Sequence, residues 1–212
     1  MARPAKPLIV RSAAIVAALE IIDAEGLEAF SVPRLAAHMG VRAPSLYHHF
    51  RSKNEILRAA VGLVAGTAIV PTGMLPGPTW PEHFVALAVQ FRLSLLRYRN
   101  VAPLLLRYPP RDLLMGGYEA AIEFLDTSGV PKALHIRIVD GMETLAVGSV
   151  LSEAIDAEHH QATGFRDADP VRQPMLAAAV RASPLAPEEL FETKVRGFLL
   201  GVVLDKPNAM RY

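Results

Sequence analysis

Hydrogen-bonding and basic side chains gather between residues 42 and 53, in the sequence RAPSLYHHFRSK. Tyr47 is followed directly by His48 and His49, and the segment from Ser31 to Lys53 contains arginine and lysine but neither aspartate nor glutamate. Tyrosine and histidine can hydrogen-bond phosphate oxygens and make apolar contact with thymine methyl groups, while a basic side chain can hold a phosphate. The segment therefore predicts contact with double-stranded DNA.

Short helices are expected to position these side chains. Apolar residues at i, i+4 and i+7 predict a first helix that ends at Gly26, and Ser31 is a suitable N-cap for a short helix that Gly40 ends. A tight turn at 40–42 leads into the next short helix, an arrangement typical of the helix-turn-helix unit, whose second helix enters the major groove. The expected helices cover about 9–25, 31–40, 43–50 and 53–64.

The helix expected over 43–50 has an inner and an outer face. Leu46 and Phe50 are expected to be buried. The outward residues, which would meet DNA, are Arg42, Ser45, Tyr47, His48 and His49.

A Pro- and Gly-rich segment, PTGMLPGPTWP at 71–81, is expected to separate two domains because it cannot continue a helix. Helical periodicity follows at 82–98, 101–107, 111–127, 132–156 and 187–204, and 159–174 is expected to be a loop. The predicted class is all-α, with a three-helix helix-turn-helix DNA-binding domain at 1–68 and a larger helical ligand-binding and dimerisation domain at 69–212.

Composition favours a soluble, cytoplasmic protein with no membrane partner. The chain has no cysteine, a net charge of +1 and 51% hydrophobic residues, without the uninterrupted apolar run of roughly 20 residues that a membrane span needs. So large an apolar fraction predicts burial between helices or at a subunit interface.

The first 60 residues resemble the tetracycline-repressor (TetR) family of bacterial one-component regulators. The resemblance rests on AFSVPRLA at 29–36, on Gly40-Val41, and on SLYHHF at 45–50 followed by Lys53. It is looser beyond, at Trp80, at 98–100, at 141–153 and at 191–204. It implies phosphate contacts by Ser31, Arg34, Tyr47 and Lys53, and places Arg42, Ala43, Pro44 and His49 near bases.

Two departures from the tetracycline repressors concern specificity. Pro33 occupies the place of a base-reading arginine, so a different operator is expected. Leu87 and Leu105 occupy the places of the polar asparagine and histidine that hold a magnesium-chelated drug, so tetracycline is not the expected ligand.

The second domain carries many apolar residues and few polar ones, which is typical of a helical core and also of a pocket for a small hydrophobic effector. Gln90 and His135 are the expected polar handles, and no metal or other cofactor is expected. The predicted ligand-binding residues are Phe84, Leu87, Gln90, Phe91, Leu104, Leu105, Tyr118, His135 and Met142.

Small residues at helical spacing suggest a homodimer made by two helices from each subunit, as a palindromic operator requires. They are Gly141, Gly148 and Ser152, with Leu145, and then Gly197 and Gly201 beside Leu190, Phe191, Val195, Phe198, Leu199 and Val202. Ordinary packing within one chain is the alternative.

The predicted function is that of a ligand-responsive transcriptional regulator, a repressor released from its operator by the effector. A helical protein-binding adaptor and an enzyme using the second domain are the alternatives, but no nucleophile and base stand at a known catalytic spacing. Glu158, His159, His160, Asp167 and Asp169 could hold a metal ion, although a solvated loop is the favoured reading.

Overall fold

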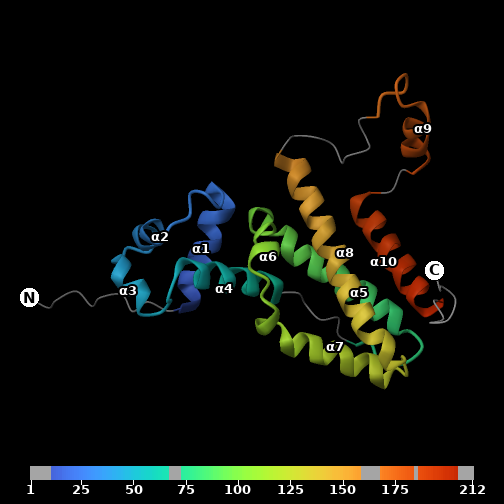
Figure 1. The fold of residues 1–212 in the computed structure, drawn as a ribbon, viewed down its shortest axis with the longest axis horizontal. Coiled ribbons are helices and arrows are strands. Elements are labelled where there is room, and N and C mark those ends of the chain that lie inside the picture. The colour runs from blue at the N-terminus through green and yellow to red at the C-terminus, as the bar shows by residue number, and fades with distance from the viewer. Residues whose placement is uncertain (1–10, 67–72, 159–167, 184–185, 205–212) are drawn as a thin grey trace, which may run out of the picture. The chain divides into compact units, whose positions relative to one another are not determined.

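The computed structural model describes residues 11–66, 73–158, 168–183 and 186–204, apart from the side chains of 154–158, and every regular element in those ranges is a helix (Figure 1). The predicted all-α class is thereby confirmed. The chain divides into two units. Met1–Thr67 and Arg97–Leu114 form the first unit, and Ala68–Leu96 and Met115–Tyr212 form the second.

The first unit opens with the helices expected from the sequence: α1 (Arg11–Glu25), α2 (Val32–His38), α3 (Ala43–Tyr47) and α4 (Lys53–Gly66). Ser31 caps α2, because its Oγ accepts a hydrogen bond from the backbone N–H of Arg34 at 3.2 Å. Gly40 has a φ of 65°, the left-handed conformation that ends this helix and starts the turn into α3.

The second short helix, α3, is shorter than predicted. It ends at Tyr47, and the backbone N–H groups of His49 and Phe50 both donate to Leu46 O at 2.9 Å in the turn that follows. Only five residues, 48–52, connect the end of α3 to the start of α4 at Lys53, and they form this turn. Leu46 and Phe50 are buried as predicted.

Residues 97–114 pack against α1 and α4, although they follow the Pro- and Gly-rich segment that was expected to begin the second domain. They form η1 (Arg99–Val101), α6 (Leu104–Arg107) and η2 (Arg111–Leu113). Asn100 Nδ2 donates to Asp23 O at 2.7 Å, and Tyr108 OH donates to Asn54 Oδ1 at 3.0 Å. Leu104 and Leu105 are thus buried within the first unit.

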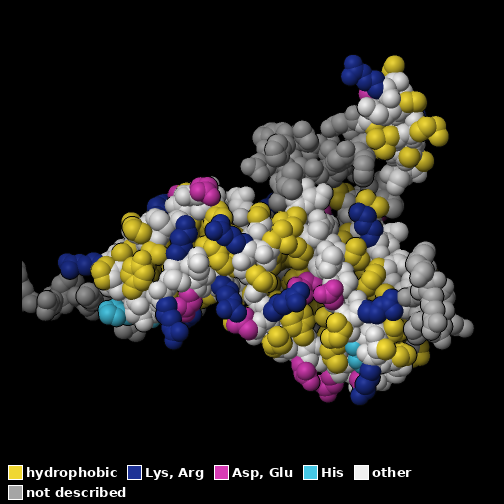
Figure 2. Space-filling model, viewed as in Figure 1, with side chains coloured by type: hydrophobic (Ala, Val, Ile, Leu, Met, Phe, Trp, Pro, Cys, Tyr) yellow, Lys and Arg dark blue, Asp and Glu magenta, His cyan; other side chains and the backbone are white. Residues whose placement is uncertain are grey.

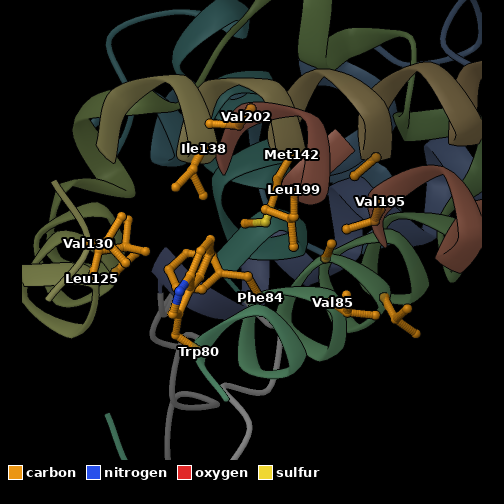
Figure 3. Packing of buried hydrophobic residues seen from close by; sticks show 14 of the residues in the cluster. Trp80, Phe84, Val85, Leu125, Val130, Ile138, Met142, Val195, Leu199 and Val202 are labelled. Atoms are coloured by element: carbon orange, nitrogen blue, oxygen red, sulfur yellow. The ribbon is translucent and has the colours of Figure 1, made fainter. Parts of the chain in front are cut away.

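The second unit is a helical bundle in which α8 (Lys132–Glu158) packs against α5 (Trp80–Leu96), α7 (Met115–Thr127) and α10 (Pro187–Leu204). Its interior is an apolar cluster (Figure 3). Among its buried members are Trp80, Phe84, Leu125, Ile138, Met142, Val195 and Leu199.

A further helix, α9 (Pro174–Ala182), was not predicted. The helix has only nine residues, and Ala177 is its one buried side chain, so few packing contacts support it. Val171 and Met175 are largely exposed, and Figure 2 shows hydrophobic side chains over α9. In the described part of the chain, no helix combines the length and apolar character needed to cross a bilayer.

Candidate nucleic-acid interface and effector site

The residues predicted to meet DNA gather on α3 and its ends. Arg42, Pro44, Tyr47 and His48 are exposed, and 55% of Tyr47 is accessible to solvent. Ala43, Ser45 and His49 are half-buried. Because Leu46 anchors the opposite face of this short helix, the exposed side chains form one polar and basic surface, called here the α3 surface.

Arg42 is the exposed arginine of the α3 surface. Arg42 occupies the N-cap position of α3, yet its side chain makes no capping hydrogen bond and no ion pair with another described residue. An exposed guanidinium of this kind can approach a phosphate or a guanine edge without first breaking an internal contact.

Arg34 and Lys53, in contrast, both have partners within the chain. Arg34 Nη2 lies 2.5 Å from Glu25 Oε1, and Arg34 Nε donates to the other carboxylate oxygen at 3.3 Å. This pairing lowers the pKa of Glu25 and raises the pKa of Arg34. Lys53 Nζ donates to Phe30 O at 2.7 Å and lies 5.5 Å from the centre of the Phe30 ring.

The acid-free run from Ser31 to Lys53 is therefore less isolated in space than in sequence. Glu25 and Glu20 of α1 approach Arg34 and His38, and the His38 Nε2 to Glu20 Oε2 distance is 3.3 Å. Figure 2 shows basic and acidic side chains on the same face of the first unit. Arg42, which has no ion pair with a described residue, is therefore stronger evidence for a DNA contact than the net charge of the segment from Ser31 to Lys53.

Arg11 is a functional candidate that sequence reasoning missed. It donates to His49 O and, at 2.7 Å, to Glu55 Oε1, and its guanidinium lies 4.4 Å from the centre of the Phe50 ring. The Arg11 hydrogen bond lowers the pKa of Glu55. Arg11 thus connects the turn after α3 to the first turn of α4 through hydrogen bonds to both.

Glu55 strengthens this connection at the start of α4. Its Oε2 accepts from Arg51 N at 2.7 Å, while its own backbone N–H donates to Ser52 Oγ at 3.2 Å. This exchange resembles a capping box, for which the sequence SKNE at 52–55 is a visible signal. The partner Arg11 could not be found from spacing because it lies 44 residues earlier.

The predicted effector residues divide between the two units. Leu104 and Leu105 belong to the first, and the remaining seven belong to the second. Of these, Phe84 and Met142 are members of the apolar cluster, against which Leu87 and Phe91 pack. The second unit therefore brings α5 and α8 residues of the predicted set together around one apolar interior.

Two polar members of the predicted set, His135 and Tyr118, already have hydrogen-bond partners within the chain. His135 is buried and its Nε2 donates to Val130 O at 2.8 Å, while Tyr118 OH donates to Glu143 Oε2 at 2.8 Å. Gln90 is half-buried on α5. His135 thus stabilises the start of α8 and is less free to bind a ligand than its sequence position suggested.

Two buried polar residues of α5 were not predicted. Arg92 pairs with Glu153, and its Nε donates to Ser149 Oγ at 3.1 Å. His83 is buried beside Phe84 and Phe124, and its Nδ1 has no hydrogen-bond partner. Apolar periodicity cannot distinguish such residues from core positions because they share the inward face of the helix.

The loop considered as a metal site falls mainly outside the described residues, as do His159, His160 and Asp167 and the side chain of Glu158. Asp169 is described, and its Oδ1 accepts from Val171 N at 2.7 Å. Within the described ranges, no three His, Asp or Glu side chains come close enough together to hold a metal ion.

Two family models match the chain. Residues 14–60 match the bacterial regulatory proteins of the tetR family, and residues 72–202 match the tetracyclin repressor-like C-terminal domain. The tetracycline repressor protein class A from transposon 1721 of Escherichia coli is 28% identical over 178 residues, which cover 83% of this chain and 82% of that protein.

Solved structures of similar fold include ActR from Streptomyces coelicolor. Apo ActR superposes with a TM-score of 0.77 at 24% identity, covering 97% of this chain and 100% of that one. ActR in complex with (S)-DNPA gives a TM-score of 0.76 at 25% identity, covering 95% of this chain and 100% of that one.

Proposed function

The chain belongs to the tetR family of bacterial regulatory proteins, and from this membership we propose that it is a DNA-binding transcriptional regulator that responds to a small molecule. The observation that carries the proposal is the pairing of a matched helix-turn-helix region with an exposed α3 surface that includes Tyr47 and the unpaired Arg42. The alternatives of an adaptor or an enzyme have no comparable support, since the relatives are regulators.

DNA is read, in this proposal, by α3 lying in the major groove. Arg42, Ala43, Pro44 and His49 meet bases, Tyr47 meets a phosphate, and Ser45 and His48 lie on the same outer surface. Ser31, Arg34 and Lys53 complete the phosphate contacts. Arg34 and Lys53 then share their donors between DNA and their partners within the chain.

The regulator is proposed to be a repressor that binds a palindromic operator as a homodimer. The class A relative is named a repressor, which supports this direction of control. Two symmetric recognition helices fit successive major grooves only at a spacing of about 34 Å, so a ligand that changes this spacing releases the DNA.

The effector is proposed to be a small hydrophobic compound held by second-unit residues of the predicted set. Apolar Phe84, Leu87, Phe91 and Met142 would supply most of the contact. The complex of ActR with (S)-DNPA supports a small-molecule ligand other than tetracycline. Leu87 offers no polar group to a chelated metal, so magnesium is not required.

Fluorescence anisotropy with DNA from upstream of the protein's own gene tests the DNA part of the proposal. Tyr47→Ala should weaken binding by about 1–3 kcal/mol with unchanged circular dichroism, because an exposed side chain stabilises little of the fold. Lys132→Ala, an exposed charge on α8, is the control and should bind like the wild type. Equal affinity of the wild type and Tyr47→Ala for this DNA would contradict the assignment of α3.

A further inference from the structure

His83 is a buried hydrogen-bonding group with no partner for one of its ring nitrogens. Only 5% of the residue is exposed, and Nδ1 meets no donor or acceptor. The imidazole stacks on Phe124, with ring centres 3.9 Å apart and planes 12° apart, and presents its edge to Phe84 at 5.5 Å.

Among the described residues of the second unit, the other buried polar side chains have hydrogen-bond partners. His135 bonds Val130 O, and Arg92 bonds Ser149 and Glu153. Most buried polar groups in proteins have such partners, and one without a partner costs stability that a ligand can restore. His83 is therefore an exception that calls for a partner outside the chain.

The position of His83 on α5 links it to the proposed effector site. On a helix with 100° per residue, His83, Leu87 and Gln90 fall on one stripe. The stripe runs from buried His83 to half-buried Leu87 and Gln90. Thus the free nitrogen lies at the buried end of a row of predicted ligand-binding residues.

The surroundings of His83 are aromatic and apolar. Phe84 also makes an edge-to-face contact with Trp80, at 5.8 Å between ring centres. Figure 3 shows Trp80, Phe84 and Met142 directed into the same interior. Met142, unbranched and adaptable, is the member best able to move aside for a ligand.

We propose that His83 is the residue that selects the effector, and that the effector is an aromatic compound whose hydroxyl group hydrogen-bonds His83 Nδ1 while its rings pack among Phe84, Phe124 and Met142. This inference rests on the proposed effector site in the second unit. It moves the principal polar handle from His135 to His83.

The chemistry of the free nitrogen favours a hydroxyl group. A neutral imidazole carries its proton on either nitrogen, so Nδ1 is an acceptor in one tautomer and a donor in the other. A hydroxyl group both donates and accepts, and therefore satisfies either form. Burial lowers the pKa of His83, which keeps the ring neutral and gives a carboxylate ligand no cation to pair with.

Calorimetry with a matched pair of probes tests the selectivity. The probes are 2-naphthol and 2-fluoronaphthalene, which are close in size but differ in hydrogen bonding. Wild-type protein should bind 2-naphthol roughly ten- to hundredfold more tightly, the ratio expected for one buried hydrogen bond. In His83→Phe, which keeps a ring on Phe124, this ratio should fall to about one.

Two further variants separate hydrogen bonding from stability. His83→Asn places an amide near the position of Nδ1 and should recover part of the preference for 2-naphthol. Val195→Ala removes buried apolar atoms from the same unit without a polar change, so it should lower the melting temperature and keep the ratio. Failure of 2-naphthol to bind wild type, or an unchanged ratio in His83→Phe, overturns the inference.

The outcome for His83 can be told apart from that for the proposed function. Hydrophobic compounds that release the protein from DNA equally well in wild type and His83→Phe would leave the regulator intact and remove the role of His83. Absence of DNA binding by wild-type protein would instead contradict the proposed function, while the probe ratio would still report on His83.

Discussion

Arg11 and Arg42 lie in the same unit but have opposite surroundings. The Arg11 guanidinium is committed to His49 O, Glu55 and the Phe50 ring, whereas the Arg42 side chain has no ion pair with any described residue. We expect Arg11 to position the turn after α3 and Arg42 to touch DNA directly.

Salt dependence separates these two roles. Each phosphate contact contributes about 0.9 to the slope of log K against log salt concentration. Arg11→Ala should lower DNA affinity several-fold with the slope unchanged, because no phosphate contact is lost. Arg42→Ala should lower affinity and flatten the slope by up to about one per subunit, because it removes a positive charge from the DNA interface. Anisotropy titrations across a salt series measure both, and a flattened slope in Arg11→Ala would show that Arg11 itself contacts DNA.

His83 should make the protein sensitive to acid. Because burial lowers its folded-state pKa, the unfolded chain takes up the proton first, near the ordinary value of about 6.5. Stability is therefore full above that pH and declines as the pH falls from there towards the lowered folded pKa. Urea unfolding at several pH values between 7.5 and 5.5 should show a smaller decline in His83→Phe than in wild type. Parallel declines would mean that His83 does not bind the extra proton on unfolding.

At the residue level, the sequence predicted which side chains face outwards on α3 but not what the charged ones contact. Tyr47 and Arg42 could be placed because a short helix with Leu46 and Phe50 inside leaves few other orientations. The Glu25 partner of Arg34 could not, since it depends on how α1 and α2 cross. Likewise, the missing partner of His83 is a property of packed neighbours rather than of sequence spacing.

At the scale of elements, the helix ends were predicted where a specific residue sets them. Ser31 and Gly40 bound α2 through a side-chain cap and a left-handed turn, and both effects are local. The helix α9, which begins at Pro174, was missed because its nine residues fall short of the roughly 10–12 from which apolar periodicity identifies a helix. Gly141 was expected to contact a second subunit, but it packs against Phe198 of its own chain.

Gly141 lets α8 and α10 approach each other. A Cβ atom at this position would overlap Phe198 Cζ and lie 2.7 Å from Cε2, so the ring would have to move. Gly141→Ala should reduce the free energy of unfolding by about 1–3 kcal/mol, a typical cost of overpacking.

Gly117→Ala on α7 is the matched control, because a Cβ there meets no atom within 4 Å. It should leave stability unchanged or raise it by up to about 1 kcal/mol through helix propensity. Chemical unfolding of both variants gives the comparison. Equal stability of Gly141→Ala and Gly117→Ala would mean that the Phe198 ring adapts without cost.

At the scale of the whole molecule, the sequence predicted two helical parts but not the path of the chain between them. Position along the chain assigned 97–114 to the second part, whereas its buried Val101 and Leu104 pack in the first unit. Long-range contacts of this kind depend on tertiary packing, which local propensity does not report.

The surface of α10 supports the proposed homodimer more specifically than the sequence did. Phe191, Val195, Leu199 and Val202 face the chain's own interior. The opposite side carries exposed Leu200, Val203 and Leu204, and a Cβ at Gly201 would meet no neighbour. We therefore place the contact between subunits on this outer side of α10, together with Gly148 of α8, which is also open.

Gly201→Leu should weaken the dimer because a large side chain would hold two closely packed helices apart. Overpacking costs about 1–3 kcal/mol, which corresponds to roughly a five- to hundredfold increase in the dimer dissociation constant. Gly117→Leu introduces the same side chain at an exposed position of α7 and should leave the dimer intact. Sedimentation over a concentration series measures both, with circular dichroism as the check on folding.

Since a palindromic site needs both recognition helices, Gly201→Leu should also bind DNA more weakly at low protein concentration and recover as concentration rises. A wild-type protein that sediments as a monomer at micromolar concentration would refute the dimer, and a Gly201→Leu variant as dimeric as Gly117→Leu would place the interface elsewhere.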